Sequence, residues 1–159
     1  MDNSSWTQLG GDIDGEAAGD YSGYSVSLSS DGSVVAIGAH YNHGNGFFAG
    51  HVRVYEWDNS NWTQLGGDID GEAAGDQSGY SVSLSSDGYI VAIGAAANNG
   101  NGSNSGHVRV YEWNSGSSSW VQKGSDIDGE AAQDVSGNSV SMNSDGSIVA
   151  IGAGNNDGN

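Results

Sequence analysis

Residues 22–39 read SGYSVSLSSDGSVVAIGA, and the fold class follows from this stretch. Its first half alternates apolar residues with serines, which is the pattern of a strand with one apolar face. Asp31-Gly32 is a dipeptide typical of tight hairpins. The run at 34–39 is continuously apolar, which favours a strand covered on both faces. The stretch therefore predicts an antiparallel β-hairpin.

Two further strands follow this hairpin. Residues 50–57 read GHVRVYEW and alternate Val52 and Val54 with larger polar or aromatic side chains. A fourth strand is expected to start at Trp62, after a short polar turn. Four antiparallel strands joined by short hairpins, with a longer acidic crossover to the next set, describe the blade of a β-propeller.

The whole chain repeats this unit. WTQLGGDIDGEAAGD stands at 6–20 and again, unchanged, at 62–76, and a close copy occupies 120–134. A fixed period of this size is typical of arrays whose units bury their apolar faces against each other. We therefore expect an all-β, propeller-like array of three near-identical units, one domain over 1–159, with the last unit incomplete. The alternative is a β-solenoid or stacked-sheet array, although solenoid coils usually repeat at shorter periods. The unit boundaries are 6–61, 62–119 and 120–159.

The repeated pattern resembles a known family. A Ser-Gly opens one strand, a Gly-Ala closes the next, and a Gly-x-Val-x-Val-Tyr strand follows. This is similar to the FG-GAP repeat of integrin-α-type propellers, in which Phe-Gly and Gly-Ala-Pro take the first two places. Here Ser precedes Gly23, Gly79 and Gly137, and the chain has no Pro. The resemblance covers nearly the whole chain and implies a non-enzymatic extracellular module for adhesion, recognition or scaffolding.

The pattern yields eleven strands, the first starting at Trp6, which is one fewer than three complete blades need. Propellers typically close with about four to eight blades. The chain is therefore expected either to be part of a longer array or to form homo-oligomers, because open sheets leave edges that recruit other chains. Two copies would close a six-bladed ring, whereas an open head-to-tail contact would build a filament.

Each crossover carries four acids on a loop that contains Gly. Alternating carboxylates can converge on Ca²⁺, which takes about six to eight oxygen ligands. The spacing departs from that of an EF-hand, so the alternative is that these acids solvate the crossover and cap its turns. The intervening Ile13, Ile69 and Ile127 are expected to anchor each crossover under a neighbouring blade. The candidate Ca²⁺ ligands are Asp12, Asp14, Glu16, Asp20, Asp68, Asp70, Glu72, Asp76, Asp126, Asp128, Glu130 and Asp134.

The sequence predicts no catalysis. Repeating the same acids in equivalent places argues against one asymmetric carboxylate pair. The chain has neither a Cys nor a Gly-x-Ser-x-Gly elbow. His40 and His43 are confined to one loop and are too few for a zinc site. His51 and His107 recur at strand starts and are interpreted as paired edge residues.

Aromatic residues recur where the third and fourth strands of a unit meet. Exposed Trp and Tyr beside Asp and Asn would suit a glycan, giving a multivalent lectin-like surface. The alternative is that the two Trp of each hairpin stack on each other and pack blade against blade. The candidate ligand or interface residues are Tyr55, Trp57, Trp62, Tyr111, Trp113 and Trp120.

Charge restricts the partners. Twenty acidic residues against three Lys and Arg give a net charge of -17. Such a surface repels nucleic-acid phosphates and anionic lipid headgroups, and no apolar run approaches the length of a bilayer span. We expect neither nucleic-acid binding nor membrane insertion. An extracellular or cell-surface location, where salt screens the self-repulsion, fits this composition.

Overall fold

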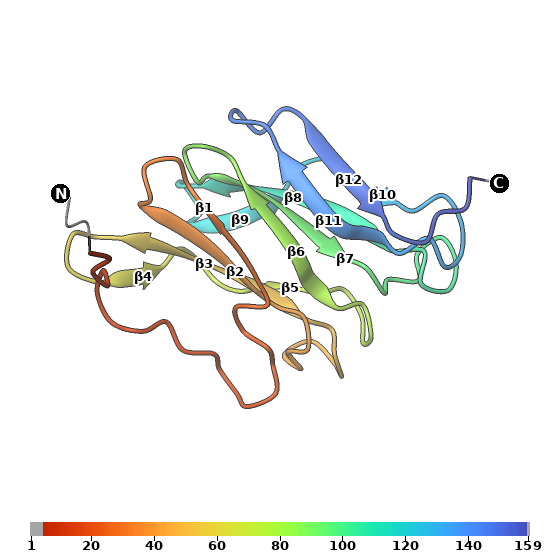
Figure 1. Ribbon diagram of the computed structural model, residues 1–159, viewed down its shortest axis with the longest axis horizontal. Coiled ribbons are helices and arrows are strands. Elements are labelled where there is room, and N and C mark those ends of the chain that lie inside the picture. Colours follow the sequence, from red (N-terminus) through yellow and green to blue (C-terminus); the bar gives the residue numbers. More distant parts are fainter. Residues whose placement is uncertain (1–4, 159) are drawn as a thin grey trace.

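The computed structural model describes residues 5–158, which form twelve β-strands and no helix. The strands group into three consecutive antiparallel sheets, and the first two sheets each take their outer strands from the start of the following sequence unit (Figure 1). Their bounds are β1 Ser25–Leu28, β2 Val34–Ala39, β3 His51–Trp57, β4 Trp62–Gln64, β5 Ile69–Asp70, β6 Ser78–Leu84, β7 Ile90–Ala95, β8 His107–Asn114, β9 Ser119–Gln122, β10 Ile127–Asp128, β11 Ser136–Met142 and β12 Val149–Ala153.

The first two sheets have the predicted blade topology, with one difference in the outer strand. Their strand orders are β1-β2-β3-β4 and β6-β7-β8-β9, and the third sheet is the hairpin β11-β12. The outer strand of the first blade is interrupted at Gly66-Gly67, so that β4 pairs with the end of β3 and β5 with its start. The second blade repeats this arrangement with β9 and β10 on β8.

The strand predicted at Trp6 does not form. Residues 5–9 adopt no strand, and the Trp6 side chain is fully exposed. The equivalent strands β4 and β9 exist because each pairs with a preceding strand, β3 or β8. Among residues 5–158 no such strand precedes Trp6, so the prediction of a strand at this position was wrong.

The hairpin turns are stabilised by their own side chains. Gly32 adopts a φ of 76°, a left-handed conformation that suits glycine. Beside it, the Asp31 carboxylate accepts a hydrogen bond from the Ser33 backbone N–H at 2.9 Å and others from the hydroxyls of Ser33 and Ser29. These bonds, the backbone one first, lower the pKa of Asp31 to about 2. The Asp-Gly signal in the sequence therefore predicted a real turn.

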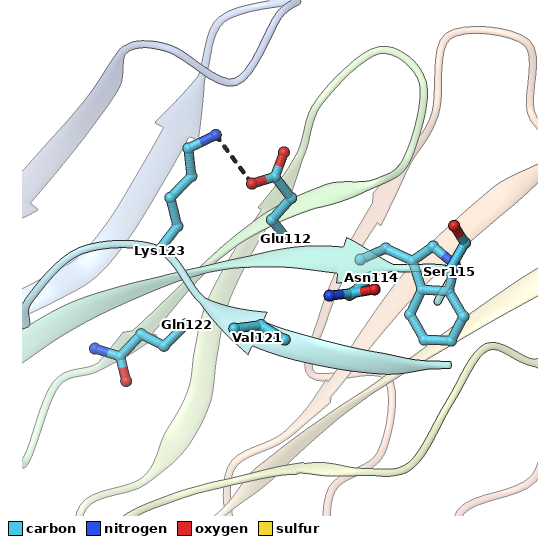
Figure 2. A pocket seen from close by; sticks show the side chains of 7 residues that line it. Glu112, Asn114, Ser115, Val121, Gln122 and Lys123 are labelled. Atoms are coloured by element: carbon cyan, nitrogen blue, oxygen red, sulfur yellow. Dashed lines mark hydrogen bonds and ion pairs between the residues drawn. The ribbon is translucent and has the colours of Figure 1, made fainter. Parts of the chain in front are cut away.

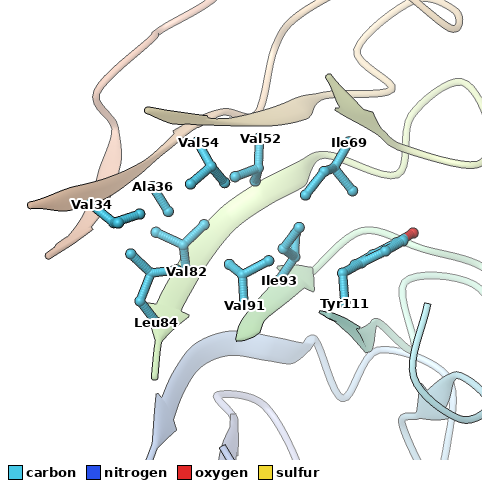
Figure 3. Close-up of a cluster of buried hydrophobic side chains, with 10 residues drawn as sticks. All are labelled: Val34, Ala36, Val52, Val54, Ile69, Val82, Leu84, Val91, Ile93 and Tyr111. Carbon is cyan, nitrogen blue, oxygen red and sulfur yellow. The ribbon is translucent and has the colours of Figure 1, made fainter. Parts of the chain in front are cut away.

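Consecutive sheets pack face to face, and the core lies between them (Figure 3). The first sheet contributes one side of β2, β3 and β5, and the second contributes the facing side of β6, β7 and β8. Burial at this junction is close to complete, as expected for sheets that have no other core. The residues of this core are Val34, Ala36, Val52, Val54, Ile69, Val82, Leu84, Val91, Ile93 and Tyr111.

Hydrogen bonds between neighbouring sheets recur at the repeat spacing. Ser25 Oγ donates to the Gly79 carbonyl at 2.8 Å, and Ser81 Oγ donates to the Gly137 carbonyl at 2.7 Å. The backbone amide of Ser86 likewise donates to the Ser144 carbonyl at 2.8 Å. Because equivalent residues make equivalent bonds, one junction geometry is used twice. The described residues thus form a propeller-like array of blades that does not close on itself.

Candidate functional site

The four acids of each crossover have different surroundings. The first, Asp68, accepts a hydrogen bond from Gln64 Nε2 at 2.7 Å, and its equivalents Asp12 and Asp126 accept the same bond from the Gln four residues earlier. The side chain of the second acid is exposed, whereas its backbone carbonyl can accept a hydrogen bond from an arginine. The Asp70 carbonyl, for example, accepts a hydrogen bond from Arg109 Nη2 at 2.8 Å.

The fourth acid of each crossover is buried and its carboxylate is occupied. Asp76 is 2% exposed, and its Oδ2 accepts bonds from the Ala73 backbone N–H and from Asn98 Nδ2, both at 3.0 Å. Asp20 accepts the equivalent amide bond from Asn42. These acids hold the loops together by capping bonds, as the alternative interpretation of the crossover expected. Asp134 accepts the corresponding bonds from Ala131 and Asn156.

The third acid meets a histidine. Glu16 Oε2 lies 3.7 Å from His51 Nδ1, and Asp68 Oδ2 lies 3.7 Å from the same nitrogen. The cluster therefore joins acids of two successive crossovers around the first residue of β3. Among residues 5–158 the groups of three or more metal-ligating side chains are this one and its repeat at Glu72, His107 and Asp126.

Both histidines are buried. His51 and His107 are each 1% exposed, and burial lowers the pKa of both imidazoles, against the opposing effect of the nearby carboxylates. The backbone register pairs His51 with Asp70 and His107 with Asp128. The expected pairing is therefore confirmed, but the expectation of edge residues was wrong, because His51 and His107 also pair on the other side of their strands, with Ala39 and Ala95. Their convergence with the crossover acids was missed in the sequence.

A signal for this convergence is present in the sequence. Glu16 recurs at Glu72 and His51 at His107 with the same offset, so the separation of the two residues is preserved between units. Spacing alone did not predict contact, because the residues come from a loop and from a strand that follows it by an entire hairpin. The three acids expected to join Glu16 in one Ca²⁺ loop are not grouped with it; Asp68 comes from the next crossover. Calcium binding at the crossovers stays a prediction.

The two Trp of each predicted pair are in contact across their hairpin, with ring planes tilted by 56° and 57° rather than stacked. The rings of Trp57 and Trp62 lie 5.4 Å apart, and those of Trp113 and Trp120 lie 5.5 Å apart. The indole N–H of Trp120 donates to the Leu65 carbonyl at 2.8 Å, which ties the hairpin of the second blade to the preceding crossover. The aromatic pairs therefore pack as structural elements.

Two equivalent hollows lie beside these pairs. The first, of about 240 Å³, is lined by Tyr55, Trp62 and the crossover around Ile13. The second, of about 230 Å³, is lined by Tyr111, Trp120 and the crossover around Ile69. Each also presents two Asp side chains, so an aromatic surface and acceptor groups face the same space. Ile69 is 5% exposed and anchors its crossover as predicted. Ile127 is 40% exposed, so the same prediction was wrong for this residue; the sheet that follows it consists, among residues 5–158, of the hairpin β11–β12 alone.

A hollow of about 440 Å³ runs along the β8–β9 hairpin (Figure 2). Its lining includes Val121 and the pair Lys123 Nζ and Glu112 Oε2, which lie 3.3 Å apart. Both side chains of this ion pair are about half exposed, so the pair contributes little to stability. The hollow has no buried polar group aimed into it and does not define a binding chemistry.

The loop histidines of the first unit lie among aromatic rings. His40 is 4% exposed, and its ring centre lies 4.1 Å from that of Tyr24 and 4.2 Å from that of Tyr41. His43 lies against Phe47, with ring centres 4.9 Å apart. Neither belongs to a group of metal-ligating residues among the described part of the chain.

Comparison with known families agrees with this architecture. Residues 69–111, from β5 to β8, match the FG-GAP repeat family. This match confirms, over residues 69–111, the resemblance inferred from the strand motifs. Such repeats are typically non-catalytic and typical of extracellular or cell-surface proteins. No curated protein matches the chain. Residues 5–158 contain no helix long and apolar enough to cross a membrane.

Proposed function

We propose that this chain is a non-enzymatic structural or adhesive module of the extracellular or cell-surface space, and that copies of it join head to tail through their end sheets. The observation that carries the proposal is a pair of exposed sheet faces whose counterparts inside the array are buried. The match to a repeat family that is typically extracellular and non-catalytic supports the location and the class.

The first exposed face belongs to β1. Val26 and Leu28 are 64% and 59% exposed. Their equivalents in the second blade, Val82 and Leu84, are 9% and 7% exposed because they pack on the first blade. The β1 face is thus the same apolar surface without its cover, among the described residues.

The second exposed face belongs to the third sheet. Ile148, just before β12, is 66% exposed, whereas its equivalent Ile90 is 8% exposed. In the internal junctions this face receives the β6 or β11 face of the next blade. The end sheets therefore carry the two complementary halves of one junction, and a second copy supplies the missing partner for each.

Backbone groups favour the same contact. At each internal junction a serine amide donates to the serine carbonyl one unit further along, as Ser30 does to Ser86 at 2.9 Å. In a head-to-tail pair the Ser144 amide would reach the Ser30 carbonyl of a second copy. Closure of two copies gives a six-bladed ring, and repeated addition gives a filament.

The test is the absolute mass of the purified chain by light scattering on a sizing column, over a range of concentrations. We expect a dimer or larger species that Leu28→Asp shifts toward monomer. If association buries Leu28 as deeply as Leu84 is buried inside the array, about half of a leucine side chain is removed from water, which contributes about 1–1.5 kcal/mol. Leu28→Asp loses this contribution, so we expect the affinity to fall at least about five- to tenfold. Val121→Asp is the matched control, since Val121 is 48% exposed but lies on the β9 hairpin. A monomer at every concentration, or equal shifts in both variants, would refute the proposal.

Calcium is proposed as an accessory that stiffens the crossovers. The support is that carboxylates such as those of Asp14 and Glu16 are exposed, which leaves oxygens accessible to a hard cation. The same column run with calcium and then with a calcium-selective chelator tests this part alone. If chelator changed neither the mass nor the thermal unfolding, calcium binding would be excluded, and the proposed head-to-tail contact would be unaffected by that result.

Glycan binding is a second candidate function. It is favoured by the two equivalent hollows in which the half-buried Trp62 or Trp120 lies beside Asp side chains, because stacking on an aromatic face with acceptors beside it suits a sugar. The test is a glycan array, repeated with Asp14→Asn and Asp70→Asn together. Both residues are exposed, so the double variant leaves the core intact. Binding that survives unchanged, or is absent from the start, excludes these hollows as sugar sites.

A further inference from the structure

We propose that Glu16, His51 and Asp68 bind a divalent transition-metal ion of the Zn²⁺ class at the junction of two crossovers and β3. The same site recurs one unit later, at Glu72, His107 and Asp126. The inference goes beyond the proposed function, because head-to-tail association through apolar faces requires no metal. It also differs from the expected Ca²⁺ loop, since its ligands come from two crossovers and include an imidazole.

The three ligand atoms are already gathered. In each cluster they all lie within 4.8 Å of one another, and His51 Nδ1 is 3.7 Å from each of its two carboxylate oxygens. Ligand atoms around a tetrahedral Zn²⁺ lie about 3.3–3.6 Å apart, given bond lengths of about 2.0–2.2 Å. Shifts of a few tenths of an ångström in exposed acidic side chains would complete the geometry at these two separations.

The imidazole nitrogen aimed at the carboxylates has no other partner. His51 Nδ1 is buried and makes no hydrogen bond. The 3.7 Å separations are too long for hydrogen bonds to either acid. A buried polar atom without a partner is costly, and in native proteins it calls for an explanation such as a bound ion. The geometry supplies one, because the nitrogen and the two oxygens surround a common point.

Neighbouring side chains orient the acids. Gln64 Nε2 donates to Asp68 Oδ1 at 2.7 Å, while the other oxygen of that carboxylate faces His51. Asn42 Nδ2 donates to Glu16 Oε2 at 3.2 Å. Metal ligands in proteins are typically held in this way by outer hydrogen bonds. The amides therefore restrain both carboxylates, and in Glu16 the oxygen that accepts from Asn42 is also the one that faces His51.

In the second site, one oxygen of the Glu72 carboxylate faces the histidine and the other faces an arginine. Arg109 Nη1 lies 3.5 Å from Glu72 Oε1, and Oε2 of the same carboxylate lies 3.9 Å from His107 Nδ1. Asp128 Oδ1 is also 3.9 Å from that nitrogen and offers a further oxygen. Together with Asp126, three carboxylates surround one imidazole and outweigh the one arginine. Local charge therefore favours a divalent cation.

The ligand set selects the ion. Ca²⁺ and Mg²⁺ are hard cations that bind oxygen ligands, whereas imidazole suits Zn²⁺ and its transition-metal neighbours. Three protein ligands leave a position open to water in a four-coordinate site. A bound ion would link the crossover that enters a blade, the third strand of that blade and the crossover that leaves it. The consequence is a clamp on each blade, which raises its resistance to unfolding.

The experiment uses the full chain, purified without a polyhistidine tag and stripped of metal, in a calorimetric titration with ZnCl₂. We expect two ions per chain. His51→Ala and His107→Ala should each remove one, and the double variant both. His43→Ala is the matched control and should keep two, because His43 is exposed and lies outside the clusters. Nitrogen chemical shifts of the imidazoles should show coordination through Nδ1 of His51 and His107 only.

A buried histidine variant could lose its fold, so Glu16→Gln reads the first site independently. Glu16 has a side chain 45% exposed, and the variant should fold and bind at that site at least about tenfold more weakly, since even outer-shell partners contribute about 10- to 100-fold. No binding, a stoichiometry unaffected by His51→Ala or Glu16→Gln, or displacement of Zn²⁺ by equimolar CaCl₂ would overturn the proposal. Binding lost only in His43→Ala would overturn it as well.

Discussion

A methyl group added at Gly94 tests whether the sheets pack as closely as the junction suggests. A Cβ at Gly94 would lie far inside van der Waals contact with the backbone carbonyl oxygen of Gly137 on the next sheet, and with Ser81 Oγ. The φ of Gly94 lies outside the left-handed region, so alanine itself is conformationally allowed there. The expected cost therefore comes from the contact between sheets.

The magnitude follows from two effects. Forcing the sheets apart is an overpacking change, which costs about 1–3 kcal/mol. It also breaks or stretches the buried bond from Ser81 Oγ to the Gly137 carbonyl, worth about 1 kcal/mol. Alanine recovers about 0.5–1 kcal/mol of strand stability relative to glycine. We expect Gly94→Ala to destabilise the chain by about 1–3.5 kcal/mol.

The chain contains its own control for this prediction. Gly152 occupies the equivalent place in β12, where a Cβ would meet the flexible Ser139 side chain and no backbone of a following sheet. Gly152→Ala should therefore change the free energy of unfolding by less than about 1 kcal/mol. The assay is urea unfolding of both variants below the concentration at which copies associate, followed by circular dichroism. Equal costs for the two variants would refute the account of the junction.

Three further predictions concern pH and salt. Burial lowers the pKa of His40, so the folded state binds fewer protons than the unfolded state. Stability therefore falls as the pH drops below the unfolded pKa of about 6.5. His40→Ala, which introduces the residue found at the equivalent position Ala96, should reduce the change in urea midpoint between pH 7 and pH 5. Hydrogen bonds hold the pKa of Asp31 at about 2, so its contribution to stability is present above about pH 4 and is lost as the pH falls through 2. Asp31→Asn should remove this contribution from the acid unfolding transition measured by circular dichroism. The net charge of -17 opposes association, so raising NaCl from low to physiological concentration should increase the mass seen by light scattering, whereas a fall in mass would contradict apolar end faces.

The fold could be predicted where strand formation depends on local pattern. The alternation before Asp31-Gly32 and the apolar run after it became β1 and β2 within a residue or two of the predicted ends. The prediction at Trp6 was wrong because the same local motif needs a preceding strand to pair with. Alternation describes which face of a strand is apolar, whereas pairing depends on which other segment is present.

The candidate metal cluster was harder to predict for a related reason. Glu16, His51 and Asp68 come from two loops and a strand edge, and each fits its local environment without the others. The density of acids in the crossovers predicted a metal loop there, but the buried Asp20 carboxylate instead accepts a hydrogen bond from Asn42. Contact between units becomes visible only when the register of β5 on β3 brings the second crossover back to His51.

Repetition explains why one set of residues governs both internal stability and association. Gly94 and Gly137 are in contact across the junction of two successive sheets. The equivalent of Gly94 in the last sheet is Gly152, and the equivalent of Gly137 in the first sheet is Gly23. Among residues 5–158, a Cβ at Gly152 meets no following sheet, and Gly23 has open space where its own Cβ would lie. In a head-to-tail pair these two glycines would take the places of Gly94 and Gly137. The substitution that spares the isolated chain, Gly152→Ala, would therefore block association at the same backbone contact by which Gly94→Ala destabilises the array.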